Sequence, residues 1–307
     1  MSCKRIKKTI LLLFVLLITP HYLYADKHAF IFENDFVAGK DSDYTNGFFY
    51  TWMSEDNNQT NTAITFTHLM FTPDDISKKE KIDDDVPYAG YINLNFLLFK
   101  STENYFHEFG VNIGAIGPIA QAKRFQKLAH HIISTTEPQG WDNQLKNKMI
   151  FGASYNIGYK TDVIDLELFE FDCINNARVD IGNFYNGGLI SSTFRVGNNL
   201  QNNFVTTGNF IGGNESSLLN FKRKDTFGWS ISGGFFLNKI NHFYIIDKVK
   251  EKRISDIDYT TGEVISFNLH YRTFELSFKV KSIYRGDNRL FQGNITQWGG
   301  LSFRWIL

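Results

Sequence analysis

Two short polar motifs near the start of the chain hold residue types that could do chemistry. One is Glu33–Asn34–Asp35–Phe36, and the other spans residues 41–47 and reads D-S-D-Y-T-N-G. Asn34 and Asp35 at the end of one strand would lie close, across a hairpin, to the hydroxyl of Thr45 at the start of the next. Carboxylate and amide oxygens are hard ligands that suit Ca²⁺. The alternative is ordinary turn chemistry, which composition alone favours because Asp, Asn, Ser and Gly dominate turns.

A second set of candidate residues lies in residues 118–146. This stretch includes 120–130, which is rich in good helix formers. Gln126 and His130 are separated by one helical turn and therefore share a face, whereas His131 points about 100° away. A neutral imidazole can accept a proton from water near physiological pH, so His130 is a candidate general base. Its alternative role is that of a packed or surface histidine.

A third candidate set is the basic group Lys78, Lys79 and Lys81 in the long loop 72–86, which also carries a string of acids. Lysine binds phosphate or acid groups of a ligand as a point charge. A solvated charged loop is the alternative. Long ordered loops tend to be functional, which favours a role for this one.

The rest of the chain consists of segments in which apolar and polar residues alternate. Examples are Ile92–Phe96, Phe109–Gly114 and Phe274–Lys281, and the last segment, 301–307, ends in phase on Leu307. Period two gives each strand one apolar and one polar face. The apolar face carries large aromatics and the other carries Gly, Ser, Asn and charge, the pattern of strands with lipid outside and a polar lumen inside. We therefore predict an all-β fold, a transmembrane antiparallel β-barrel with a helical extracellular loop. A soluble β-sandwich, which could share the aromatic content of 16%, fits this pattern less well.

The alternating segments give about twelve candidate strands, an even number, as bacterial barrels require. The last candidate, 273–307, could divide into 273–286 and 293–307, and one of the middle candidates could instead be loop. The candidates are residues 27–36, 46–54, 60–71, 88–100, 105–116, 147–159, 163–173, 178–197, 203–212, 226–238, 263–272 and 273–307.

The N-terminus has the features of a secretory signal peptide. Four basic residues precede the apolar run Ile10–Ile18, and small Ala25 precedes Asp26. We predict a signal peptide over 1–25 and a single barrel domain over 26–307. Without the signal the chain has 28 Lys and Arg against 32 Asp and Glu, a net charge of −4, which argues against nucleic-acid binding. Cys173 is then the one cysteine left, so no internal disulfide can form.

The ordered set of motifs resembles the outer-membrane lipid A 3′-O-deacylase family. The matching elements, in chain order, are E-N-D-F at 33–36, D-Y-T-N-G at 43–47, P-Y-A-G-Y at 87–91, G-A-I-G-P at 114–118, Q-K-L-A-H-H-I-I at 126–133 and G-W-D-N-Q at 140–144. Their order and spacing match over about residues 30–145, and the remainder matches as barrel strands.

This resemblance implies a twelve-stranded barrel with its active site in the outer leaflet, between the barrel wall and the loop helix. Members remove the 3′-acyloxyacyl chain of lipid A by Ca²⁺-dependent ester hydrolysis. The essential Asn and Asp of the family fall on Asn34 and Asp35, its hydroxyl residue on Thr45, and its Gln and His on Gln126 and His130.

The chemistry of that assignment is coherent. His130 would act as the general base on water, and Asp35 with Asn34 would contribute to the Ca²⁺ site, completed by backbone carbonyls. Gln126 and Thr45 would orient water or substrate. Ca²⁺ could stabilise the negative charge that develops on the ester carbonyl. The partners expected are lipopolysaccharide, the outer membrane and its barrel-insertion machinery, and a monomer is expected.

Two positions depart from the family pattern. Val86 stands where Arg usually precedes P-Y-A-G, and Glu137 lies near the family's acidic position without matching it clearly. Both bear on substrate preference more than on reaction type. The alternative functions are an outer-membrane phospholipase, which would need a serine nucleophile, and a passive channel or adhesin.

Overall fold

The computed structural model describes residues 26–35, 44–54, 59–83, 85–133, 137–210, 212–249, 259–285 and 295–307. The predicted signal peptide, 1–25, lies outside these ranges. The strands are β1 (Lys27–Asn34), β2 (Tyr44–Met53), β3 (Thr60–Phe71), β4 (Ala89–Ser101), β5 (Tyr105–Ile116), β6 (Lys148–Lys160), β7 (Ile164–Asp165), β8 (Glu170–Gly182), β9 (Tyr185–Asn198), β10 (Lys224–Phe243), β11 (Thr260–Arg272), β12 (Phe274–Arg285) and β13 (Ile295–Ile306). The helices are η2 (Pro118–Ala120), α2 (Ala122–Ile133), η3 (Gly140–Asn143), η4 (Glu215–Leu218) and η5 (Ile246–Lys248).

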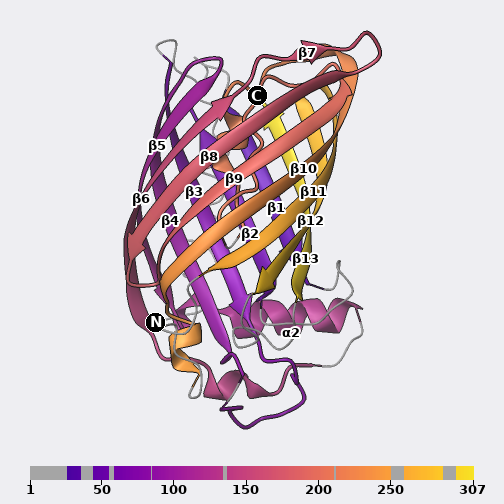
Figure 1. Ribbon diagram of the computed structural model, residues 1–307. Coiled ribbons are helices and arrows are strands. Elements are labelled where there is room, and N and C mark those ends of the chain that lie inside the picture. Colours follow the sequence, from indigo (N-terminus) through magenta and orange to yellow (C-terminus); the bar gives the residue numbers. More distant parts are fainter. Residues whose placement is uncertain are drawn as a thin grey trace.

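Twelve of these strands form a closed antiparallel barrel, as predicted (Figure 1). Each strand pairs with its neighbours in sequence, and β1 pairs with β13. The ring closes where β6 pairs with β8 from Gly152–Gly182 to Lys160–Ile174. The two-residue β7 only extends β8 at one end. Closure pairs the backbone polar groups within the sheet, which a bilayer requires.

The outer surface of the barrel is apolar and its interior is polar. Outward positions such as Phe109, Val111 and Ile113 on β5 are more than two-fifths exposed. The inward positions that alternate with them include Glu108, which accepts a hydrogen bond at 2.6 Å from Arg178 of β8. The alternation seen in the sequence therefore sorts lipid-facing from lumen-facing side chains, as the transmembrane interpretation required.

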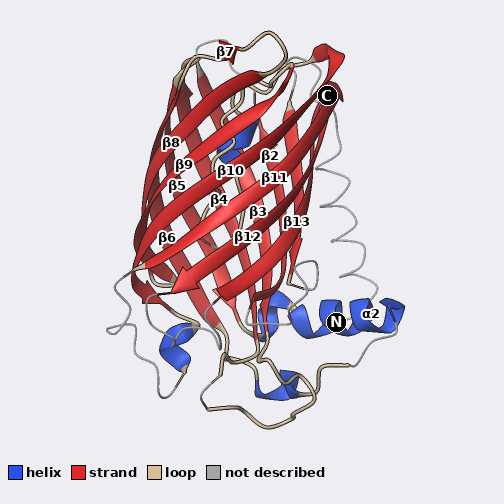
Figure 2. Ribbon diagram, turned by 45° about the vertical axis from the view of Figure 1, so that its right-hand side comes forward, coloured by secondary structure: helices blue, strands red, loops and turns tan. Residues whose placement is uncertain are grey.

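The connection from β9 to β10, residues 199–223, enters the lumen and fills it. Figure 2 shows its helix η4 inside the strand wall. Phe204, Leu218 and Phe221 of this segment are fully buried against inward residues such as Phe106. A buried ion pair of 2.5 Å between Arg195 and Asp172 fixes the base of the segment, together with hydrogen bonds to Asn203 and Gln201. We refer to residues 199–223 as the plug.

The plug explains one wrong strand prediction. Residues 203–212 were predicted as a strand but belong to the plug, and the predicted strands 163–173 and 178–197 are displaced relative to β8 and β9. The segment 273–307 does divide into β12 and β13. Loss of one candidate and division of another leave the count at twelve. Within the described residues, no helix has the length and apolar character needed to span a bilayer.

The barrel has two distinct ends. Leu307 donates its backbone N–H to Asp26 at 3.0 Å, so both ends of the described chain meet at one rim (Figure 1). Helix α2 crosses the opposite rim, where β1 ends and β2 begins (Figures 1 and 2). The motifs that carry candidate chemistry therefore meet at the rim away from Asp26 and Leu307, which we call the α2 rim.

Candidate active site

The first hairpin brings three of the predicted site residues together. The side-chain amide of Asn34 donates to the carbonyl oxygen of Thr45 at 2.9 Å, and the backbone N–H of Asp35 donates to the same oxygen at 3.4 Å. Asp35 is 2% exposed, although it follows the last residue of β1. The Asn–Asp pair and the hydroxyl residue thus occupy one corner of the α2 rim.

A β-bulge at Thr45 sets the direction of its side chain. The register between β2 and β3 shifts between Tyr44 and Asn46, which leaves Thr45 as the extra residue. Bulges re-aim a side chain next to functional sites. The hydroxyl of Thr45 consequently lies 2.6 Å from the hydroxyl of Thr72, just beyond β3. Thr72 was not among the predicted site residues, because only the bulge brings it there.

The outward side chains of four adjacent strands form a row at the α2 rim. Strand register places Asn34 opposite Asn46, Asn46 opposite Met70, and Met70 opposite Gly90. The Oδ1 atom of Asn46 is buried and has no hydrogen-bond partner among the described residues. A buried amide oxygen without a partner is costly, which favours a ligand there. Asn46 is therefore an additional site candidate.

Helix α2 is seated on this row because one position of β4 lacks a side chain. A methyl group at Gly90 would lie 2.5 Å from Cβ of Ala122 and 3.0 Å from Cβ of Ala120. On the neighbouring strand β3, His68 contacts the carbonyl oxygen of Ala120 at 2.9 Å and packs edge-on against Phe125, with ring centroids 5.1 Å apart. The Gly of P-Y-A-G is thus the residue that lets the helix approach the wall.

One side of α2 faces the return segment 137–143. Lys127 pairs with Glu137 at 3.3 Å, and Lys123 forms an ion pair with Asp142. The Lys123 ammonium holds the pKa of the Asp142 carboxyl below its ordinary value. These exposed pairs align the two segments but contribute little to stability.

The buried link between α2 and the return segment is a hydrogen bond from Trp141. Its indole N–H donates to Oε1 of Gln126 at 2.6 Å, and the two residues are 1% and 4% exposed. Because the indole nitrogen can only donate, this bond fixes which end of the amide is oxygen. The Nε2 donor of Gln126 is buried without a partner in the described part of the chain. It is therefore free to bind an oxygen atom of a ligand.

His130 lies one turn beyond Gln126 on the same side of α2, as the sequence spacing indicated, and it is half-buried. His131, on a different side of the helix, is exposed. Helix and hairpin residues come from the same rim of the barrel, and Asn34 and Asn46 face its outer side.

The loop with the predicted lysines is bound to the return segment through its backbone. Gln139 donates its N–H to Ile76 at 2.9 Å, and Asn143 donates its side-chain amide to the carbonyl of Lys79 at 2.6 Å. The side chains of Lys78, Lys79 and Lys81 are exposed, and Lys78 pairs with Asp75 at 3.6 Å. Val86, by contrast, is 3% exposed and belongs to the apolar core, so no basic group is present there.

The donor set of the hairpin fits a hard cation in its chemistry. Asp35 supplies a buried carboxylate, and Asn46 supplies the amide oxygen that lacks a partner. Within the ranges described, no three His, Cys, Asp or Glu side chains come together as a metal-binding group. Since Ca²⁺ takes six to eight oxygens, backbone carbonyls and water would have to provide the others.

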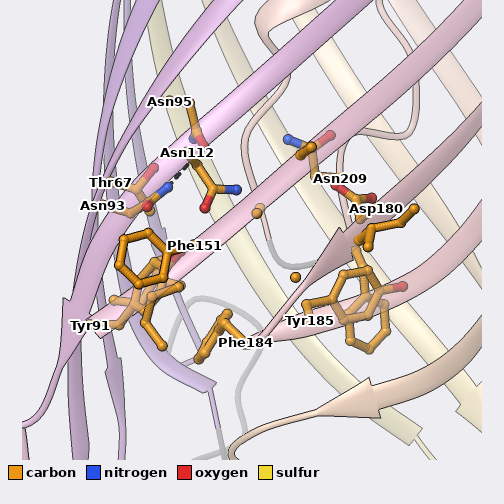
Figure 3. Close-up of a pocket in the computed structure, with 18 of the residues that line it drawn as sticks. Thr67, Tyr91, Asn93, Asn95, Asn112, Phe151, Asp180, Phe184, Tyr185 and Asn209 are labelled. Carbon is orange, nitrogen blue, oxygen red and sulfur yellow. Dashed lines mark hydrogen bonds between the residues drawn. The ribbon is translucent and has the colours of Figure 1, made fainter. Parts of the chain in front are cut away.

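A separate cavity lies inside the barrel, between the plug and the wall (Figure 3). Its volume is about 110 Å³, and its described lining includes Asn93, Asn95, Asn112 and Asp180 but none of the predicted site residues. Asn93 donates to Asn95 at 2.8 Å, whereas its own Oδ1 lacks a partner among the described residues. A polar cavity of this size suits ordered water.

A closed twelve-stranded barrel with apolar outer walls, a filled lumen and a polar site on its outer rim defines an integral protein of the bacterial outer membrane. The sequence profile of the family "Outer membrane protein LpxR" matches residues 10–307. The chain belongs to this family, which confirms the family predicted from the motifs.

A solved structure of the family has the same fold. LpxR from Salmonella typhimurium aligns with a TM-score of 0.76 at 16% identity, covering 91% of this chain and 99% of that one. The COG4313 outer membrane channel from Pseudomonas putida F1 gives a TM-score of 0.40 at 10% identity, covering 94% and 100%. No curated protein sequence matches the chain.

We predict that Gly90→Ala displaces α2 from the wall, because its methyl group would overlap that of Ala122. Hydrogen exchange of the amides of α2, followed by mass spectrometry, should become faster. The matched control is Gly233→Ala on β10, where an added methyl group meets nothing within 4 Å. Equal exchange of α2 in both variants would show that Gly90 does not position the helix.

Proposed function

We propose that this protein is a Ca²⁺-dependent lipid A 3′-O-deacylase, which hydrolyses the ester of the 3′-linked acyloxyacyl chain in the outer leaflet. Membership of the LpxR family supports a lipid A deacylase of the outer membrane. The observation that carries the finer proposal is the position of α2. It places Gln126 on a helix that packs on Gly90 of β4, in the outward row that also contains Asn34 and Asn46. Polar groups that face outward at a membrane rim are suited to a lipid ester.

The chain's own residues divide the reaction between them. The imidazole of His130 accepts the proton of the attacking water. Nε2 of Gln126, fixed by Trp141, donates to the substrate carbonyl oxygen, and Thr45 orients water or substrate. The proton then passes to the leaving alkoxide of the sugar, so acid and alcohol are released. No acyl-enzyme is required, and no serine is assigned as nucleophile.

The cation has a defined place in the proposal. Asp35, with the amide oxygens of Asn34 and Asn46, would hold Ca²⁺ at the hairpin. When bound there, it would supply positive charge for the oxyanion of the transition state. The exposed Lys78, Lys79 and Lys81 would contact the phosphates and acidic sugars of the substrate above the membrane. Val86 removes one further basic contact that the family pattern usually provides.

A passive channel is disfavoured by the plug, whose apolar side chains pack against the lumen wall. A barrel phospholipase remains the alternative enzyme. The two enzymes differ in product, since one would shorten lipid A and the other would release lysophospholipid.

His130→Ala should abolish deacylation. Loss of a general base lowers rates by roughly 10²–10⁴-fold. The measurement is mass spectrometry of lipid A and phospholipids from cells that express each variant. The matched control is His131→Ala, which removes an exposed imidazole from another side of α2. Full activity of His130→Ala would exclude it as the base, and unchanged lipid A with increased lysophospholipid in the wild type would favour the phospholipase.

Chelation of Ca²⁺ should stop turnover by the purified barrel, and added Ca²⁺ should restore it. Mg²⁺ should restore little activity, because it demands a tight octahedral shell and gives up water reluctantly. Asp35→Asn should raise the Ca²⁺ concentration needed for half-maximal rate. A rate that is unaffected by chelator would contradict the metal role while leaving the deacylase reaction in place.

Trp141→Phe should lower the deacylation rate while keeping the aromatic contact with Tyr88, whose ring centroid lies 5.0 Å away. The substitution removes the donor that orients Gln126. A neutral hydrogen bond is worth about 1 kcal/mol, so we expect a roughly three- to tenfold decrease. Trp229→Phe, at the barrel end away from α2, serves as the control. Equal rates in the two variants would show that Trp141 has no orienting role.

A further inference from the structure

An apolar groove runs along the outer wall of the barrel, from the neighbourhood of α2 toward the rim that carries Asp26 and Leu307. Its volume is about 520 Å³, and side chains from strands β2 to β6 line it. The main lining residues are Tyr50, Trp52, Ile64, Phe66, Leu94 and Ile113. These side chains face lipid, and Ile64, Phe66, Leu94 and Ile113 are each 38–44% exposed. We call this feature the wall groove.

The wall groove begins next to the candidate site, on the same outer wall. Its boundary nearest α2 is the outward pair Ile92 and Ala115. On β4, Ile92 is the next outward residue after Gly90. Ile119 of η2 projects over this end and is half exposed. Because the carbonyl of Ala120 in η2 also contacts His68, the element that covers the groove is the one that leads into α2.

Helix α2 lies between the wall groove and the corner of the α2 rim that carries Asn34 and Asn46. Ala122 lies on Gly90 of β4, and Phe125, almost one turn later, lies on His68 of β3. The next strands in the ring, β2 and β1, carry Asn46 and Asn34 at the same rim. A lipid with its ester at that corner has the groove beside it on the same wall.

The depth of the wall groove is a large part of one leaflet. From His68, which pairs with Ile92, to Ile64 at the far end of the groove is four residues along β3. At about 3.3 Å per residue this is roughly 13 Å along the strand, or about 10 Å along the membrane normal for a strand tilt of about 40°. Half of a hydrocarbon core of about 30 Å is roughly 15 Å, so the groove covers about two thirds of that depth.

We propose that the wall groove is a binding subsite for one acyl chain of the lipid substrate, which it holds while the ester lies under α2. This proposal rests on the proposed function. The occupant is an acyl chain of lipid A, since the lining is apolar and the end of the groove nearest η2 lies next to the candidate site. An annular phospholipid without any role in the reaction is the competing occupant.

The groove acts by orientation more than by affinity. Lipid tails are as apolar as the groove, so transfer of a chain from the bilayer gains no hydrophobic free energy and depends on packing. A held chain, however, fixes the depth and direction of the ester relative to the site. Catalysis is sensitive to such placement, because a 1 Å displacement can cost roughly 10²-fold in rate.

The experiment compares Leu94→Trp, which fills the groove at β4, with Ile265→Trp. Ile265 is a lipid-facing residue of β11, on the opposite side of the twelve-stranded ring. Deacylation is measured with lipid A species whose acyl chains differ in length. Leu94→Trp should lower kcat/KM by about tenfold, less than complete misplacement would cause. The loss should be larger for long chains than for short ones.

A second variant, Phe66→Ala, enlarges the groove and should shift preference toward longer chains. Ile265→Trp should resemble the wild type in rate and in chain preference. Equal rates and unchanged chain preference in Leu94→Trp and Ile265→Trp would overturn the subsite, with the deacylase function intact.

Failure of the proposed function gives a different result. The wild type would then release no acyl chain from any lipid A. In that case the identity of the lipid in the groove decides the subsite: a photoreactive residue is placed at position 66 or at position 265 and cross-linked in bilayers that contain both lipid A and phospholipid. Preferential cross-linking of lipid A at position 66 but not at position 265 supports the subsite, and the same lipid ratio at both positions overturns it.

Discussion

Strict alternation of side chains in a closed barrel is the constraint on which the structure depends. Every backbone N–H and C=O within the bilayer must be paired in the sheet, so consecutive residues are committed to opposite faces. Within the strands, Glu33 faces inward, where Tyr44 donates to it at 2.8 Å, and Asn34 faces outward. Polar groups can converge on the lipid side only where the ladder ends. The bulge at Thr45 and helix α2 both lie at that limit.

The position of α2 depends on close apolar packing more than on charge. Its ion pairs to the return segment involve side chains that are 38–83% exposed, and such pairs are worth about 0–1 kcal/mol. Ala122 and Trp141, in contrast, are buried with Met70 in one cluster. Small residues at the Gly90 contact let backbone approach backbone, as at helix interfaces in membranes. Phe125 and Leu128 of α2 are more than half exposed, although the Phe125 ring also contacts His68, which suits a helix lying at the membrane interface.

The sequence predicted the barrel well, because each strand repeats the same two-residue period. It failed at residues 203–212, where apolar residues among Asn and Gly imitate a strand but pack inside the lumen as part of the plug. No local pattern distinguishes these cases, since the burial comes from distant strands. The motifs predicted Asn34, Asp35, Thr45, Gln126 and His130 as site residues, and the structure brings all five to one rim. Spacing could not reveal that Trp141 orients Gln126 or that Thr72 meets Thr45, because both contacts depend on loop geometry.

The polar groups inside the barrel and those at the α2 rim differ in what satisfies them. In the lumen, charges are paired at short range, as in Arg195 with Asp172. The amide oxygens left over at Asn93 and Asn112 line a cavity that is large enough for water. Oδ1 of Asn46 and Nε2 of Gln126 are buried at the α2 rim without a partner among the described residues. A bound cation would satisfy the Asn46 oxygen, and an oxygen atom of a lipid headgroup would accept from the Gln126 amide. For this reason the proposed substrate site lies at the wall and not in the lumen.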